Sequence, residues 1–256
     1  MCNRLAFSFG VAFCVAAPVA AQETAVWPER TFVSVNVPIQ ALNNGFTESI
    51  SVADALRRNE NDTFVARYES VRGPLADIAT GIRLARRIGA GIAVSWLQRT
   101  SASAVDLSIP NPLVADRPLT LSAPVPDLDR REIGIHIQTL YAISLGRRTR
   151  VMASGGPSVF VVTQDLIESV EFERLPGFTG IQFADAIVKN DRETSVGFNV
   201  GADVTWALTS RFGVGTVVRY SRATVTFNPS SASGSARSID VTAGGLHIGG
   251  GIRVFF

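Results

Sequence analysis

Two histidines, His136 and His247, are the residues of this chain best suited to acid–base or metal chemistry. Hydrolysis or acyl transfer by a histidine needs a serine or aspartate beside it, at a surface that the substrate can reach. Neither histidine has such a partner at a telling spacing, and both lie amid small residues. Two isolated histidines without a nearby cysteine also make no metal-ligand set. The sequence therefore predicts no catalytic residue, no metal site and no cofactor.

A second group of polar residues shares one parity within long alternating segments, which indicates one common face. Its members are Asp77, Arg83, Glu132, His136, Asp203, Arg219, His247 and Arg253. On an enclosed face these charges must be paired and hydrogen-bonded, because an unpaired buried charge costs several kcal/mol. The group is interpreted as a neutralised network that closes an interior. The alternative is a polar path for a small solute or ion, since inward charges tune the selectivity of a pore.

The alternation itself predicts strands. In residues 246–256 one parity reads Leu, Ile, Gly, Ile, Val and Phe, while the other reads His, Gly, Gly, Arg and Phe. The same split recurs in 88–97, 132–143 and 196–206, and a period of two is a strand property. In a soluble sandwich the second face would meet water. Here that face is rich in glycine and carries isolated charges, which favours the tight interior of a narrow membrane barrel.

The N-terminus predicts export. Arg4 precedes an uncharged apolar run over 5–17, and Val19-Ala20-Ala21 places small residues before a cleavage site after Ala21. We therefore expect a signal peptide at 1–21 and one domain at 22–256. Both cysteines fall in the removed segment, and the remaining chain is almost neutral, which indicates no nucleic-acid partner. Mean hydropathy is +0.22, yet no later stretch of about 18 apolar residues exists, so the apolar residues are spread by alternation.

The strands are expected to form four hairpins, an even count typical of bacterial barrels. The expected strand pairs are 31–52 with 63–84, 88–109 with 128–144, 151–175 with 181–208, and 212–227 with 239–256. Very short connections at 85–87, 146–149 and 209–211 join these hairpins. We expect β-bulges at Pro38 and Pro157, because proline cannot donate to a closed ladder. A short helix within 183–188 is an alternative for part of the third hairpin.

The last residues, Ile252-Arg253-Val254-Phe255-Phe256, carry a family resemblance, as do the segments Gly155–Ser158 and Gly197–Asp203. In these segments the chain resembles small bacterial outer-membrane β-barrel proteins of the OmpA transmembrane-domain and OmpW type. The resemblance implies an all-β fold, an eight-stranded antiparallel up-and-down transmembrane barrel with extended extracellular hairpins and both termini periplasmic. It also implies that Ile252, Val254 and Phe256 form a signal for the barrel-assembly machinery. The chain departs from the OmpA pattern in lacking a peptidoglycan-binding domain after the last strand.

Four aromatic residues, Trp96, Tyr141, Trp206 and Tyr220, fall on the parity expected to face lipid, where aromatics anchor at membrane interfaces. The chain is thus expected in the outer membrane, with membrane lipid as its partner and a structural or surface-interaction role around a closed polar lumen. The expected loops 57–62, 109–126 and 172–181 are candidates for binding a surface partner. A narrow porin or transporter of small or hydrophobic solutes is the alternative, and a lipid-modifying barrel enzyme is disfavoured.

Overall fold

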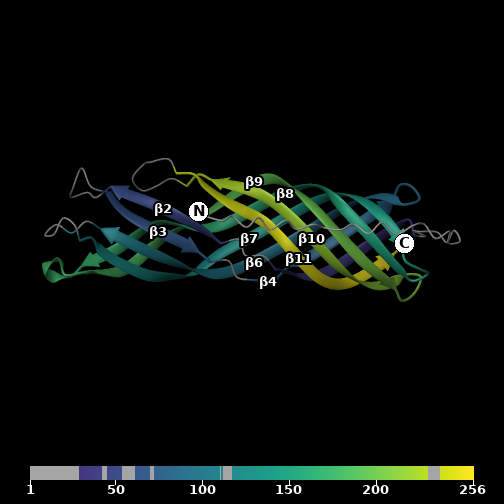
Figure 1. Cartoon of the computed structure of the whole chain (residues 1–256), viewed down its shortest axis with the longest axis horizontal. Helices are drawn as coiled ribbons and strands as arrows, with labels where there is room; N and C mark the ends of the chain where they lie inside the picture. The colour runs from purple at the N-terminus through teal and green to yellow at the C-terminus, as the bar shows by residue number, and fades with distance from the viewer. Residues whose placement is uncertain are drawn as a thin grey trace, which may run out of the picture.

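The computed structural model describes residues 29–41, 45–53, 61–69, 72–109, 111, 117–229 and 237–256, and most of them lie in strands. The elements are β1 (Thr31–Gln40), β2 (Phe46–Ala53), β3 (Asn61–Tyr68), β4 (Gly73–Pro74), β5 (Ala76–Arg83), β6 (Ile88–Ile109), β7 (Leu119–Ser144), β8 (Thr149–Arg174), η1 (Pro176–Phe178), β9 (Ile181–Ala207), β10 (Phe212–Phe227) and β11 (Ile239–Phe255). The long strands tilt and wind along the axis of an elongated molecule (Figure 1). The expected signal peptide and its cysteines lie outside the described residues.

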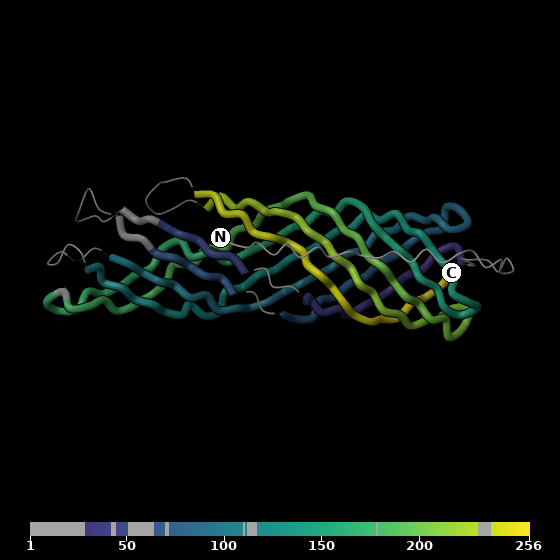
Figure 2. Tube along the Cα trace, in the orientation of Figure 1, coloured from purple at the N-terminus to yellow at the C-terminus, as the bar shows by residue number. Residues whose placement is uncertain are grey.

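Eight strands close into a ring in the order β1-β5-β6-β7-β8-β9-β10-β11, and every adjacent pair is antiparallel. The ring closes where β1 pairs with β11, from Phe32 opposite Phe255 to Gln40 opposite His247. Short turns join β5 to β6, β7 to β8 and β9 to β10 at the end of the molecule where the C-terminus lies (Figure 2). The predicted eight-stranded antiparallel barrel is therefore confirmed. We call this end the short-turn end.

The strands run well beyond the closed ring. On the far side β2 pairs with β3, β3 pairs with the second half of β6, and β9 leaves β10 above the pair Phe198–Arg222. The molecule thus has two parts. The ring segment comprises 31–40, 76–97, 132–158, 196–221 and 246–256. The distal segment comprises 46–53, 61–68, 98–109, 119–131, 159–195, 222–227 and 237–245.

The first hairpin differs from the prediction, because each of its two strands is interrupted. Residues 31–52 divide into β1 and β2, and residues 63–84 divide into β3, β4 and β5. Pro38 lies at the interruption of the β1–β5 ladder, where its carbonyl accepts a bond from the Leu75 amide at 2.9 Å. The bulge expected there is wrong: Pro38 keeps its register opposite Gly249, whose missing side chain leaves room for the proline ring.

The other proline predictions also need correction. The β7–β8 ladder keeps one register on both sides of Pro157, so no bulge forms there, and the irregularities lie instead at 101–103, 167–169 and 171–172. The proline-rich segment expected as a tip over 110–126 is shorter, since β7 already begins at Leu119. Pro124 and Pro126 fit within β7 because its pairing with β8 starts only at Arg130. Residues 183–188 belong to β9 and form no helix.

Candidate functional site: the barrel interior and its outer belt

Apolar side chains pack together inside the ring at the short-turn end. Phe32, Leu140, Ala142, Met152 and Phe255 form a buried cluster that we call the lower plug. These residues come from β1, β7, β8 and β11, so the plug crosses the interior of the ring. A path along the barrel axis would therefore meet packed hydrocarbon at this end.

Above the lower plug, four charged side chains and Asn36, from five strands in all, form a continuous network. Asp77 on β5 accepts a hydrogen bond from Asn36 Nδ2 at 2.8 Å and pairs with the Arg219 guanidinium on β10. Arg253 on β11 donates to Asn36 Oδ1 and pairs with Asp203 on β9. The two acids and two arginines neutralise one another. This arrangement satisfies charges that would be costly to bury singly.

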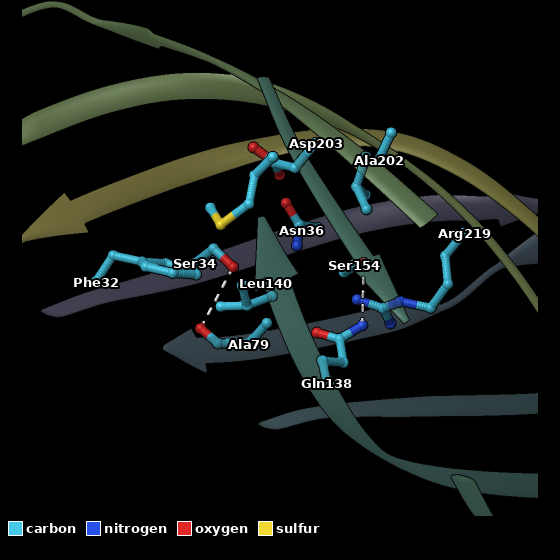
Figure 3. Close-up of a pocket in the computed structure, with 12 residues that line it drawn as sticks. Phe32, Ser34, Asn36, Ala79, Gln138, Leu140, Ser154, Ala202, Asp203 and Arg219 are labelled. Carbon is cyan, nitrogen blue, oxygen red and sulfur yellow. Dashed lines mark hydrogen bonds between the residues drawn. The ribbon is translucent and has the colours of Figure 1, made fainter. Parts of the chain in front are cut away.

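A small cavity of about 30 Å³ lies between the lower plug and this network. Figure 3 shows Asn36, Asp203 and Arg219 around it, together with Phe32 and Leu140 of the lower plug. A water molecule needs about 10–15 Å³ by the same measure, so the space holds about two waters. It offers no room for a sugar, an amino acid or an acyl chain.

The next layer is built around His136, which is completely buried. Its Nε2 lies 3.1 Å from Ser95 Oγ on β6, and its Nδ1 lies 2.8 Å from Ser158 Oγ on β8. Asn199 Nδ2 on β9 donates to Ser158 Oγ at 2.9 Å. Gly134 is required beside them, because a Cβ there would stand 2.6 Å from Ser95 Oγ. The histidine thus has two serine partners, but both are enclosed where no substrate can reach them.

A third polar layer ends the ring segment. Glu132 accepts one hydrogen bond from the Gly244 amide and another from Arg130 Nη2 at 3.1 Å. Gln40 Nε2 donates to the Gly244 carbonyl at 2.6 Å, and Arg99 Nη2 donates to Gln40 Oε1 at 2.7 Å. Gly244 can turn its backbone towards these side chains because its φ is +83°, a conformation that favours glycine.

The distal segment has an apolar interior, which we call the distal core. Its largest fully buried members include Phe64, Leu128, Phe160, Leu166 and Phe227. These residues come from β3, β7, β8 and β10, so the distal core covers the third polar layer. Along the barrel axis, the interior therefore consists of the apolar lower plug, the polar layers and the apolar distal core.

One ion pair is buried within the distal core, outside the ring segment. Glu48 on β2 pairs with the Arg237 guanidinium, and Tyr68 Oη accepts a hydrogen bond from the Ile167 amide at 2.8 Å. Burial raises the pKa of Glu48 to about 7, against the lowering effect of Arg237. Burial also raises the pKa of Tyr68 above its ordinary value.

The predicted interior residues mostly lie where the alternation placed them. Asp77, Glu132, His136, Arg219, His247 and Arg253 are buried, and Asp203 is half-buried. Arg83 is half-buried at the end of β5, by the short turns. Sequence reasoning missed Arg130 as the partner of Glu132, although the two share a parity. It also missed Ser95 and Ser158, because it looked for partners of His136 near in sequence rather than on adjacent strands.

The outward face of the ring segment is apolar and exposed on every strand of the ring. Its exposed members include Val37, Ile78, Ile92, Ile137, Ala153, Val200, Val218, Ile248 and Ile252. Soluble proteins rarely expose a continuous apolar patch of more than a few hundred Å². A closed ring with an apolar band outside and a polar interior is the arrangement of outer-membrane barrels. The protein is an outer-membrane β-barrel.

Comparisons with known proteins identify similar solved structures. The chain is similar to Neisserial surface protein A (14% identity, 88% of this chain, 97% of that chain, TM-score 0.43). It is also similar to the outer membrane protein OprG from Pseudomonas aeruginosa (9% identity, 89% of this chain, 96% of that chain, TM-score 0.49). A third similar structure is the outer membrane protease OmpT from Escherichia coli (10% identity, 90% of this chain, 97% of that chain, TM-score 0.43). No protein-family model and no curated protein sequence matches the chain.

The remaining predicted residues of the barrel lie on its outer face. Trp96, Tyr141 and Trp206 are exposed, and Tyr220 is half-buried with its ring 6.1 Å from that of Phe198. Ile252 and Phe256 are exposed and Val254 is half-buried. Within the described ranges, no helix is long and apolar enough to cross a membrane, and no cluster of three metal-ligating side chains occurs.

Proposed function

We propose that this outer-membrane barrel is a non-conducting structural or surface-interaction protein whose lumen is closed. One observation carries this proposal: two apolar clusters flank hydrogen-bonded polar layers, and the cavity described above the lower plug is only about 30 Å³. The interior of an eight-stranded barrel is just wide enough for side chains to fill. A narrow pore would instead need polar residues that continue to both ends.

The orientation follows from the unequal lengths of the connections. Outer-membrane barrels have short periplasmic turns and longer extracellular loops. We therefore propose that the short-turn end faces the periplasm, with both chain ends there after cleavage behind Ala21. The distal segment then projects outside the cell as a rigid extension with its own core. Its outer surface carries a polar groove of about 170 Å³ lined by residues that include Gln98, Arg131 and Asn190, a place where a surface partner could bind.

We further propose that the barrel is not an enzyme. The serine–histidine contacts at His136 are the nearest approach to a catalytic group among the described residues, and this histidine has no exposed surface. A nucleophile must meet its substrate within about 3 Å, which the packing around His136 prevents. A histidine-dependent lipid modification in isolated membranes, lost in His136→Ala, would contradict this part of the proposal.

The conductance of the refolded protein in planar bilayers tests the closed lumen. We expect no discrete single-channel events from the native sequence. As a positive control, the double variant Phe32→Ala/Leu140→Ala removes two side chains of the lower plug and should open a path. The matched variant Ile137→Ala/Phe198→Ala removes similar volume from the exposed outer face and should stay silent. Persistent channels from the native protein, at the same frequency as from the plug variant, would show that the lumen is open.

A further inference from the structure

Four arginines occupy equivalent positions around the short-turn end. Arg30, Arg87, Arg148 and Arg211 each come directly before a strand that leaves this end, namely β1, β6, β8 and β10. These four strands alternate with the other four around the ring, so the arginines are distributed over its whole rim. We call these four residues the arginine rim.

The backbone of the arginine rim is held in the same way at each position. The carbonyls of Arg87, Arg148 and Arg211 accept hydrogen bonds from amides of the neighbouring strands β7, β9 and β11 at 2.8, 2.8 and 2.9 Å. The Arg30 carbonyl accepts the Arg83 amide at 2.9 Å. All four side chains are exposed. The arginine rim therefore presents four positive charges around the short-turn end, each attached to a hydrogen-bonded backbone position.

The short-turn end has a strong excess of positive charge. Arg86 and Arg147 lie in the same turns as Arg87 and Arg148 and are also exposed. Among the described residues of the turns and of the segment before β1, Glu29 is the one acidic side chain, and it pairs with the buried Arg150. The almost neutral charge of the whole chain conceals this asymmetry, because most acidic residues lie elsewhere.

The arginine rim lies where the apolar belt ends. Leu84, Leu145, Leu208 and Phe212 flank the turns and expose 64%, 65%, 56% and 57% of their surface. The belt therefore reaches the level of the arginines, and the boundary between hydrocarbon and water falls there. Lipid headgroups occupy this boundary, and arginine side chains can extend to it while their stems remain in apolar surroundings.

We propose that the arginine rim binds the phosphates of anionic phospholipids in the leaflet at the short-turn end. The distribution of the charges favours lipid over a soluble polyanion, because they encircle the barrel instead of forming one patch for a single partner. This inference rests on the proposed function only for the orientation, which makes that leaflet the periplasmic one. Guanidinium groups suit phosphate because they donate two parallel hydrogen bonds to it.

The native Trp206 provides a probe for this site. It lies opposite Thr149 and next to Ala207, whose amide bonds to Arg148, so it reports on lipid at the rim. In a Trp27→Phe/Trp96→Phe background, quenching of Trp206 fluorescence by brominated phosphatidylglycerol is compared with quenching by brominated phosphatidylcholine at equal mole fraction. We expect the anionic lipid to associate up to about fivefold more strongly, and the preference to fall at about 0.5 M salt.

Charge-removing variants separate the rim from general electrostatics. In Arg30→Gln/Arg87→Gln/Arg148→Gln/Arg211→Gln most of the preference should be lost, with Arg86 and Arg147 retaining a small part. The control Arg117→Gln/Arg192→Gln/Arg222→Gln removes exposed arginines far from the short-turn end and should retain the native preference. Equal quenching by both lipids in the native rim would overturn the proposal, as would binding of a soluble polyanion such as heparin without any lipid preference. Conductance is independent of this readout, so failure here leaves the closed lumen standing, and the reverse also holds.

Discussion

The ring segment and the distal segment have opposite polarity although the same strands build both. In the ring part of β10, the outward Val214 and Val218 are exposed while the inward Arg219 is buried. In its distal part the outward residues are Arg222, Thr224 and Thr226, and the inward residues are Ala223, Val225 and Phe227. The ladder between β10 and β11 has no register shift between the two parts. We call this exchange of the apolar and polar faces the inversion. It results from the order of the residues along the strand, since the backbone pairing does not change.

The difference follows from what surrounds each part. In lipid an apolar outer face is favoured, and the interior can hold charges if they pair across the ring. In water a strand assembly is held together by burying apolar surface, so the distal segment needs an apolar core and a polar outside. The boundary between the two patterns marks the level at which the barrel leaves the membrane.

The largest effect is expected from breaking the paired interior of the ring segment. Asp77→Asn removes the charge that balances Arg219 and should destabilise the barrel by about 3–5 kcal/mol, as measured by urea unfolding in lipid vesicles. Adding Arg219→Gln should recover part of the loss, since it removes the unpaired charge. Asp240→Asn, at an exposed distal position, should change stability by less than about 0.5 kcal/mol. An unchanged stability of Asp77→Asn would show that the two charges do not depend on each other.

A smaller difference in stability is expected when a lysine is placed on the outer face of the ring segment or of the distal segment. Val218→Lys places a charge in the belt and should cost about 2–4 kcal/mol near the bilayer centre. Thr224→Lys, six residues later on the same face of β10, should be almost neutral because that face meets water. Unfolding of both variants in vesicles checks the contrast, which is lost if the two lysines cost the same.

The ring and its hairpins were largely predictable from sequence, whereas the inversion was missed. Alternation in residues 196–206 and 246–256 placed the inward and outward faces, and the short connections fixed the pairing. The signal for the inversion was present in β10, where apolar residues change from even positions at 214–220 to odd positions at 223–227. Alternation assigns residues to the two faces of a strand, but it does not indicate whether lipid, water or a core contacts each face. It therefore did not reveal that the strand leaves lipid.

The interruption of the first hairpin and the partners of His136 could not be predicted for different reasons. Pro38 was taken to need a bulge, but the opposing Gly249 provides room for it, and that pairing is known only once the ring is closed. Ser95 and Ser158 reach His136 through strand register across about 41 and 22 positions of sequence. The alternation gave parity but not register, so it could not identify which inward residues touch.

The smallest effect concerns the buried carboxyl group of the distal core. Because the pKa of Glu48 is raised from 4.5 to about 7, its protonated form is favoured in the folded state. The stability of the β2–β3 hairpin should therefore be greatest below pH 4.5 and fall as the pH rises to about 7, by about 1–2 kcal/mol. Amide hydrogen exchange, corrected for the intrinsic rate, would show this as faster opening of the hairpin at pH 8 than at pH 5.

Glu48→Gln should abolish this pH dependence, whereas Glu193→Gln, exposed on β9, should retain it. Opening rates that rise as the pH falls would contradict the direction of the effect. The ring segment serves as an internal reference, and its exchange should not follow the Glu48 titration.

The inversion along β10 can be tested most directly by site-directed spin labelling, because residues 22–256 contain no cysteine. Single cysteines at 214, 216, 218, 222, 224 and 226 would be labelled after refolding into vesicles, and collisions with oxygen and with a water-soluble nickel complex compared. The account predicts that oxygen dominates at 214–218 and the nickel complex at 222–226. The same reagent dominating at all six positions would contradict it.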